Sequence, residues 1–73
     1  MSSVKYIIAS TVVNIDGKNV ISYGIRCLEN GRICLEYPDV LPDKTKVADL
    51  VKLCNELEVC PIRIPKILED FLP

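Results

Sequence analysis

Two short turn signals, Asp16-Gly17 and Asn30-Gly31, constrain the fold of this chain more than any other feature of its sequence. Each lies between runs that are rich in Ile, Val, Thr and Tyr, residues that are enriched in β-strands. Asp-Gly and Asn-Gly pairs flanked by such runs are typical of β-hairpins. The pattern therefore predicts a meander of three antiparallel strands over about residues 4–14, 19–28 and 32–37.

The type of turn decides which side chains share a face of this sheet. With two-residue turns, Arg26 would lie on the same face as Leu35 and Tyr37, and both faces would mix apolar and charged side chains. With three-residue turns, each a type I turn followed by a left-handed glycine, the two faces separate more cleanly. We therefore expect the three-residue turns Ile15-Asp16-Gly17 and Glu29-Asn30-Gly31.

The expected register gives the sheet one apolar face and one mixed face. The apolar face collects Ile7, Ala9, Val13, Ile21, Tyr23, Ile25, Cys27, Ile33, Leu35 and Tyr37. The mixed face carries polar side chains together with Tyr6, Ile8, Val12, Val20 and Leu28. Gly24, in the middle of the second strand, indicates either a close approach by another backbone or a local bend.

The second half of the chain predicts two helices after a connector at residues 38–44, in which Pro38 and Pro42 act as breakers. Apolar side chains recur at helical spacing in two stripes, over about residues 45–57 and 64–72. The stripes are Val47, Leu50, Val51, Cys54 and Leu57, and then Ile64, Ile67, Leu68, Phe71 and Leu72. Asp43 or Thr45 can cap the first helix, and Pro65 suits the first turn of the second.

These elements predict an α+β fold in which both helices pack on the face of the sheet that holds Tyr23 and Ile25. The 73 residues suffice for one domain, residues 1–73. The start of the chain lacks the basic and apolar segments of a secretory signal, and its longest apolar stretch is too short to span a bilayer. We therefore expect a cytoplasmic protein with reduced cysteines and no membrane partner.

Catalytic, metal-binding and cofactor-binding patterns are weak throughout the sequence. The chain has no histidine, and its four cysteines, Cys27, Cys34, Cys54 and Cys60, form no Cys-x-x-Cys pair. In the expected register Cys27 and Cys34 point to opposite faces, which excludes a disulfide between them. Cys27 and Cys54 fit the role of small core residues, whereas Cys60 lies near a helix start, where a thiolate is favoured. We expect no enzyme, no metal site and no cofactor.

Binding is the class of function that the sequence supports better than catalysis. The apolar side chains of the mixed face, Tyr6, Ile8, Val12, Val20 and Leu28, form a candidate interface, because contiguous apolar patches on a solvated face mark interaction sites. We therefore hypothesise a small non-enzymatic protein-interaction or regulatory module that acts through a homodimer or an unidentified protein partner. The alternative is a nucleic-acid-binding module that uses Arg26 and Arg32. The neighbouring Glu36, the net charge of −1 and the pI of about 5.2 make it the weaker hypothesis.

Three segments of the chain resemble one known family in their order and spacing. They are Tyr23-Gly24-Ile25, then Leu50-Val51-Lys52-Leu53-Cys54-Asn55, and then Cys60-Pro61 followed by Ile67-Leu68-Glu69-Asp70-Phe71-Leu72. Together they resemble a family of short, uncharacterised Gram-positive bacterial proteins, a domain of unknown function, over nearly the whole chain. The resemblance implies a small cytoplasmic protein with strands first and helices last, and it brings no activity or catalytic residue. Two positions depart from the family pattern: Cys60 stands where members tend to have a serine or similar cap, and Pro65 where they tend to have a polar residue.

Overall fold

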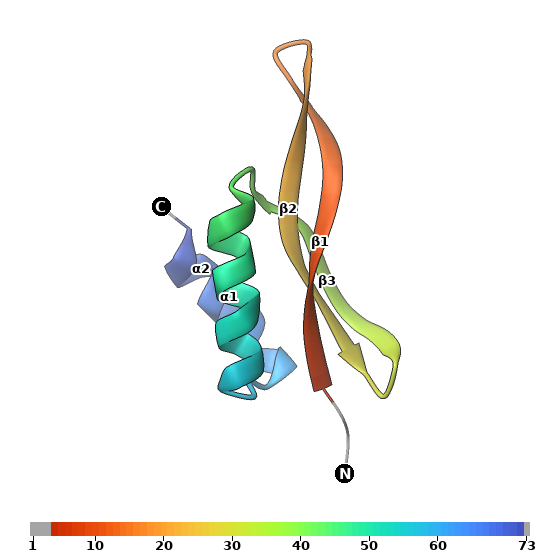
Figure 1. The fold of residues 1–73 in the computed structure, drawn as a ribbon, viewed down its shortest axis with the longest axis vertical. Coiled ribbons are helices and arrows are strands. Elements are labelled where there is room, and N and C mark those ends of the chain that lie inside the picture. The colour runs from red at the N-terminus through yellow and green to blue at the C-terminus, as the bar shows by residue number, and fades with distance from the viewer. Residues whose placement is uncertain (1–3, 73) are drawn as a thin grey trace.

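Three antiparallel strands followed by two helices make up the fold, which confirms the predicted α+β class (Figure 1). The computed structural model describes residues 4–72. The strands are β1 (Val4–Ile15), β2 (Lys18–Glu29) and β3 (Arg32–Leu41), in the sheet order β1-β2-β3. The helices are α1 (Lys44–Glu56) and α2 (Ile64–Phe71), and a short 3₁₀ helix, η1 (Pro61–Arg63), leads into α2.

Both hairpin turns have two residues, so the expectation of three-residue turns is wrong. Ile15 pairs with Lys18 across the first turn, and Glu29 pairs with Arg32 across the second. All four central residues have positive φ angles, 52° and 80° in the first turn and 53° and 81° in the second. These angles define type I′ turns, whose twist matches that of the flanking strands, and Asp, Asn and Gly tolerate them best.

Because the first turn has two residues, each side chain of β1 lies on the face of the sheet opposite to the expected one. Tyr6 pairs with Cys27 and Ile8 pairs with Ile25, so Tyr6 and Ile8 lie on the face that the helices cover. Ile7 and Ala9, which were expected on that face, lie on the other one. A slip of one residue moves every side chain of a strand to the opposite face, which is why one wrong turn misplaces all of β1.

Two irregularities in β3 keep apolar and charged side chains on separate faces of the sheet, which a regular strand with these turns would not do. Cys34 is an extra residue between the pairs Cys27–Leu35 and Leu28–Ile33, and this bulge returns Leu35 to the helix-covered face. Arg26 then pairs with Glu36 on the opposite face. The separation of apolar and charged side chains therefore comes from a bulge within the strand and not from a longer turn.

The second irregularity surrounds Pro38, where the sequence predicted the end of the strand. Tyr23 pairs with Leu41 and Ile25 pairs with Tyr37, so residues 38–40 together lie opposite Gly24. Proline is tolerated at such a bulge because no ladder hydrogen bond is required of it there. β3 consequently continues to Leu41 and is longer than predicted.

Gly24 is the point at which β3 lies directly against β2. A Cβ atom at this position would be 1.8 Å from the Tyr37 carbonyl oxygen and 2.6 Å from the Pro38 carbonyl carbon. Beside it, the hydroxyl of the buried Ser22 donates a hydrogen bond to Asp39. The predicted close approach of another backbone is confirmed. Figure 1 shows β3 passing behind β1 and β2 on its way to α1.

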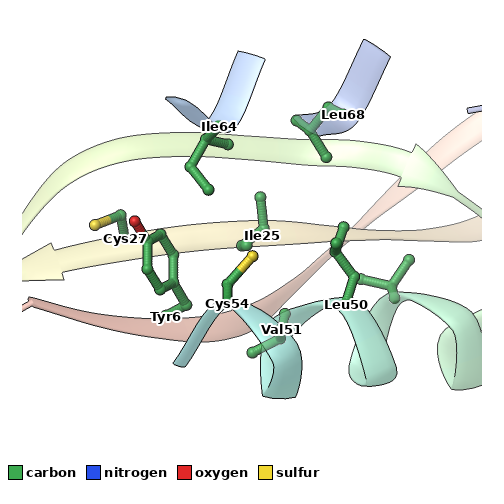
Figure 2. Packing of buried hydrophobic residues seen from close by; sticks show 9 residues of the cluster. Tyr6, Ile25, Cys27, Leu50, Val51, Cys54, Ile64 and Leu68 are labelled. Carbon is green, nitrogen blue, oxygen red and sulfur yellow. The ribbon is translucent and has the colours of Figure 1, made fainter. Parts of the chain in front are cut away.

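The helices close one core against the face of the sheet that carries Ile25, as predicted. Its buried side chains are Tyr6, Ile25, Cys27, Val47, Leu50, Val51, Cys54, Ile64 and Leu68. Figure 2 shows α2 approaching this cluster from one side, through Ile64 and Leu68, and α1 from the other. Cys27 and Cys54 are core residues, which confirms the role expected of them.

The helix boundaries follow the local capping chemistry. Asp43 is the N-cap of α1, and its carboxylate accepts a hydrogen bond of 3.2 Å from the Lys46 N–H. Pro65 lies in the first turn of α2, as expected, since the missing N–H is not needed there. The sequence did not predict η1, which begins directly after Cys60.

Replacing Gly24 by alanine should be strongly destabilising. We expect Gly24→Ala to lower the free energy of unfolding by about 3 kcal/mol, because the atoms that the new methyl group meets belong to the backbone. Gly17→Ala is the matched control, because a Cβ there meets no atom within 4 Å and only the φ of +80° is unfavourable. Its cost should be about 1 kcal/mol. Urea unfolding compares the two variants, and equal losses would contradict the close approach.

Stability should fall as the solution becomes alkaline. Burial, together with the hydrogen bond of the Cys34 side chain, raises the pKa of the Cys27 thiol to about 12, and burial also raises the pKa values of Cys54 and Tyr6. The unfolded chain releases the thiol protons above about pH 8.5, while the folded chain keeps them, so unfolding releases protons and stability is lost as pH rises. The expected slope is about 1.4 kcal/mol per pH unit for each thiol.

Urea unfolding at several pH values between pH 7 and pH 10, in the presence of a reductant, measures this slope. Cys54→Ala should reduce the slope by the contribution of one thiol, because alanine carries no proton to release. A free energy of unfolding that stays constant from pH 8 to pH 10 would contradict the burial of these thiols.

Candidate functional site

The distal part of the β1–β2 hairpin stands clear of the rest of the protein. β3 pairs with β2 only as far as Tyr23, whose partner on β1 is Ser10. Residues 10–23, which we call the arm, therefore continue beyond that point as a two-stranded ribbon, and Figure 1 shows the arm rising past both helices. The arm makes the molecule elongated, with extents of 46 × 24 × 18 Å.

A side chain from α1 covers the outer edge of β1 at its base. The Tyr6 N–H donates to Asn55 Oδ1 at 2.7 Å, and Asn55 Nδ2 donates to the Tyr6 carbonyl at 2.8 Å. The amide of Asn55 thus takes the place of a neighbouring strand at this one residue. It also shows that the backbone groups of Tyr6 point away from β2.

The direction of the Tyr6 backbone fixes the direction of every second residue along β1. In an antiparallel pair, residues alternate between bonding their partner strand and pointing outward. The register between β1 and β2 is continuous from Val4 to Ile15, so Ile8, Ser10, Val12 and Asn14 also point their N–H and C=O groups outward. Within residues 4–72, β1 has no strand on that side. We call the stretch Ile8–Asn14 the free edge.

The free edge lacks the devices that usually protect an edge strand. Proteins keep such edges from pairing with other chains by charged side chains, prolines, bulges or a covering element. No charged residue and no proline lies between Lys5 and Asp16, and the β1–β2 ladder contains no bulge. Within residues 4–72, the side-chain hydrogen bonds to the outward backbone groups of β1 are those of Asn55 at Tyr6.

Apolar side chains on both faces of the arm accompany this edge. Val12 and Ile21 are cross-strand partners on the face that the helices cover lower down, and they are 64% and 52% exposed. Val13 and Val20 are partners on the opposite face and are half-buried. A two-stranded ribbon is only marginally stable in water, so exposed apolar pairs on it favour further association.

The five residues of the predicted interface do not form one patch. Tyr6 is only 2% exposed, and Ile8 packs against the core, so both were wrongly placed on an uncovered face. Val12 lies on the arm and is accessible. Val20 and Leu28 lie on the face opposite Val12, because side chains alternate along β2. The prediction missed Ile21, the exposed partner of Val12, and the covering role of Asn55, for which the sequence carries no local signal.

The two arginines of the nucleic-acid hypothesis both face carboxylates. Arg26 forms an ion pair with Glu36 across β2 and β3. Arg32 is exposed and pairs in register with Glu29. A phosphate would have to compete with these carboxylates, and the arginines therefore do not form an open basic patch.

The Tyr6 hydroxyl is a polar group that stabilises the fold. The Tyr6 hydroxyl donates a hydrogen bond to the Val59 carbonyl and so links β1 to the segment between the helices.

Cys60 is exposed, and its side chain makes no capping hydrogen bond to η1. Among residues 4–72, no three His, Cys, Asp or Glu side chains are grouped so as to hold a metal ion. No helix in the same range has the length and apolarity needed to cross a membrane.

Cys34 lies beside Cys27, contrary to the expectation that the two cysteines point apart. The Cys34 Sγ is 3.5 Å from the Cys27 carbonyl oxygen, within reach of a weak hydrogen bond. The physical reason is the bulge at Cys34, which a regular strand register does not contain. Both cysteines are free thiols.

Removing the Asn55 amide should uncover the base of β1 and weaken the fold. We expect Asn55→Ala to lower the free energy of unfolding by about 2 kcal/mol, because the N–H and C=O of Tyr6 lose their partners in a partly buried position. Lys52→Ala, on the same helix, is the control, since its pair with Glu56 is exposed and long, and such pairs contribute little. Urea unfolding measures both, and similar small losses would argue against the edge-covering role.

Comparison with known proteins adds a family to this geometry. No curated protein and no solved structure matches the chain significantly. Residues 2–73 match a family described as a family of unknown function, DUF6514. The match covers nearly the entire sequence, as the resemblance of its three segments implied, and the chain therefore belongs to the DUF6514 family.

Proposed function

We propose that the protein is a non-enzymatic interaction module that associates with a second copy of itself by antiparallel pairing of the two free edges. The observation that carries the proposal is the row of outward-pointing backbone groups at Ile8, Ser10, Val12 and Asn14 on an unprotected strand. Strand addition to such an edge is a common mode of protein recognition, in which the main-chain hydrogen bonds supply affinity.

A second copy suits this edge better than an unrelated chain does. Two identical strands can pair antiparallel about a two-fold axis, so that each contact occurs twice and the assembly closes. The absence of charge between Lys5 and Asp16 means that the paired segments do not repel each other. The result is a four-stranded ribbon, which is more stable than two separate two-stranded arms.

The position of Asn55 limits how far the two edges can overlap. Because Asn55 occupies the outward groups of Tyr6, pairing can begin only at Ile8. If Ile8 of one copy lies opposite Asn14 of the other, Thr11 falls on the two-fold axis. Lys5 at the base of one copy then comes close to Asp16 at the tip of the other arm, and these opposite charges favour this register.

Apolar burial adds to the hydrogen bonds of the paired edges. In this register Ser10 of one copy lies opposite Val12 of the other, so two Val12 side chains gather near the centre of the ribbon. Each has Ile21 beside it on the same face. Val12, the most exposed large apolar side chain of the arm, is thus the one that the second copy brings to the centre of the ribbon.

Proline at position 10 should prevent association without unfolding the arm. The Ser10 N–H points outward, so Ser10→Pro removes a donor of the free edge and leaves the ladder to β2 intact. By symmetry two intermolecular hydrogen bonds are lost, about 2 kcal/mol in all, which weakens the dimer about thirtyfold. Sedimentation equilibrium over a wide concentration range measures the dissociation constant.

Ser10→Ala is the matched control, because it changes the same side chain and keeps the N–H. We expect it to dimerise like the unmodified protein, while circular dichroism shows the same fold for both variants. A strictly monomeric unmodified protein at high concentration would contradict the proposal. So would a Ser10→Pro variant that is folded and still dimerises with unchanged affinity.

A further inference from the structure

Two free thiols, Cys27 and Cys34, lie side by side on neighbouring strands of the described part of the chain. Cys27 lies on β2 with its thiol in the core, at 1% exposure, whereas Cys34 is the exposed extra residue of the β3 bulge. Cys34 Sγ lies 3.5 Å from the Cys27 carbonyl oxygen, and the Cys34 side chain contributes to the raised pKa of the Cys27 thiol.

The bulge gives the pair a geometry that suits a covalent bond. Cys34 stands opposite the step from Cys27 to Leu28, so the two residues are immediate cross-strand neighbours. Opposed residues of antiparallel strands have Cα separations of about 4.5–5.5 Å, which lie within the range that disulfides span. The two backbones are therefore close enough for a disulfide to join them.

The surroundings of the pair favour oxidation over metal binding. A tetrahedral metal site needs three or four ligands, and no third cysteine, carboxylate or histidine joins these two within residues 4–72. Cys54 is buried in α1, and Cys60 precedes η1 and lines grooves with residues such as Arg63 and Ile62. Neither belongs to the pair.

We propose that Cys27 and Cys34 form a modification site that is converted to an intramolecular disulfide by small-molecule disulfides of the glutathione class. The exposed Cys34 reacts first and the buried Cys27 resolves the intermediate. The modification closes the β2–β3 hairpin covalently at its bulge, close to the Asn30-Gly31 turn.

The chemistry proceeds in two balanced exchange steps. The Cys34 thiolate attacks one sulfur of the small disulfide, which forms a mixed disulfide on Cys34 and releases one small thiolate. The Cys27 sulfur then attacks the Cys34 sulfur, which forms the Cys27–Cys34 bond and releases the second small thiolate, while the Cys27 proton passes to it or to water. Two protein thiols are oxidised, and one small disulfide is reduced to two thiols.

The difference in burial sets the order of the two steps. A thiol must be accessible and at least partly ionised to attack an external disulfide, and burial in the core keeps Cys27 protonated and out of reach. Once Cys34 carries the mixed disulfide, the second attack is intramolecular. Proximity then compensates for the weak ionisation of Cys27.

Oxidised glutathione tests the site in the full-length folded protein. After incubation, the remaining thiols are blocked by alkylation in denaturant and the chain is digested with trypsin without reduction. Cleavage after Arg26, Arg32 and Lys44 separates the two cysteines, Cys27 in residues 27–32 and Cys34 in residues 33–44. We expect a disulfide-linked pair of these peptides, which separates on reduction.

Two variants decide which thiols take part. Cys60→Ser removes the other exposed cysteine and should leave the linked pair of peptides unchanged. Cys34→Ser alters an exposed position and should abolish the linked pair while the far-ultraviolet circular dichroism stays the same. A stable glutathione adduct on Cys34, a bridge to Cys60, or both peptides recovered in alkylated form would each overturn the proposal.

Discussion

The contact of the β3 backbone with Gly24 is the constraint on which the rest of this structure depends. Because no side chain separates the strands at that point, residues 38–40 bulge across β2, and the chain leaves the sheet toward α1. That departure has two consequences. It places α1 against the face of the sheet that carries Ile25 and Tyr6. It also means that β1 and β2 continue without a third strand beside them. The arm and the core therefore have one structural origin.

Tyr6 connects the strands to the helices through both its backbone and its side chain. Its N–H and C=O bind the Asn55 amide on α1, and its hydroxyl binds the Val59 carbonyl between the helices. Part of the β1 edge is thus satisfied from within the chain. Beyond Tyr6 nothing in the described part of the chain replaces Asn55, so the end of this covering marks the beginning of the free edge. The interaction that stabilises the fold also determines where association can begin.

The sequence predicted the elements well and their register poorly, and the reason is physical. Turn dipeptides and helical stripes are local signals, so the three strands, both helices and the Asp43 cap were accessible. Register depends on whether each turn has two or three residues, and for regular strands three-residue turns give the more amphipathic sheet. The bulges at Cys34 and Pro38 break that regularity. Cys34 has no signature that distinguishes it from ordinary strand residues, and Pro38 indicates a break without showing that the strand resumes after it. For this reason the sequence placed Tyr6, and with it the predicted interface, on the wrong face of the sheet. Gly24 did indicate the point at which the β3 backbone lies against β2.

The proposed modification site lies on β2 and β3 and the proposed dimer edge lies on β1, yet both border Tyr6. Cys27 is the cross-strand partner of Tyr6, and both side chains are buried in the same core. A disulfide to Cys34 would replace the thiol proton and fix the Cys27 sulfur toward β3. The Tyr6 hydroxyl would keep its hydrogen bond to the Val59 carbonyl. Because the backbone of Tyr6 remains held by Asn55, a change at its ring need not reach Ile8. Oxidation of the two cysteines, which bridges the β2–β3 hairpin, should therefore leave pairing through the free edge of β1 unchanged.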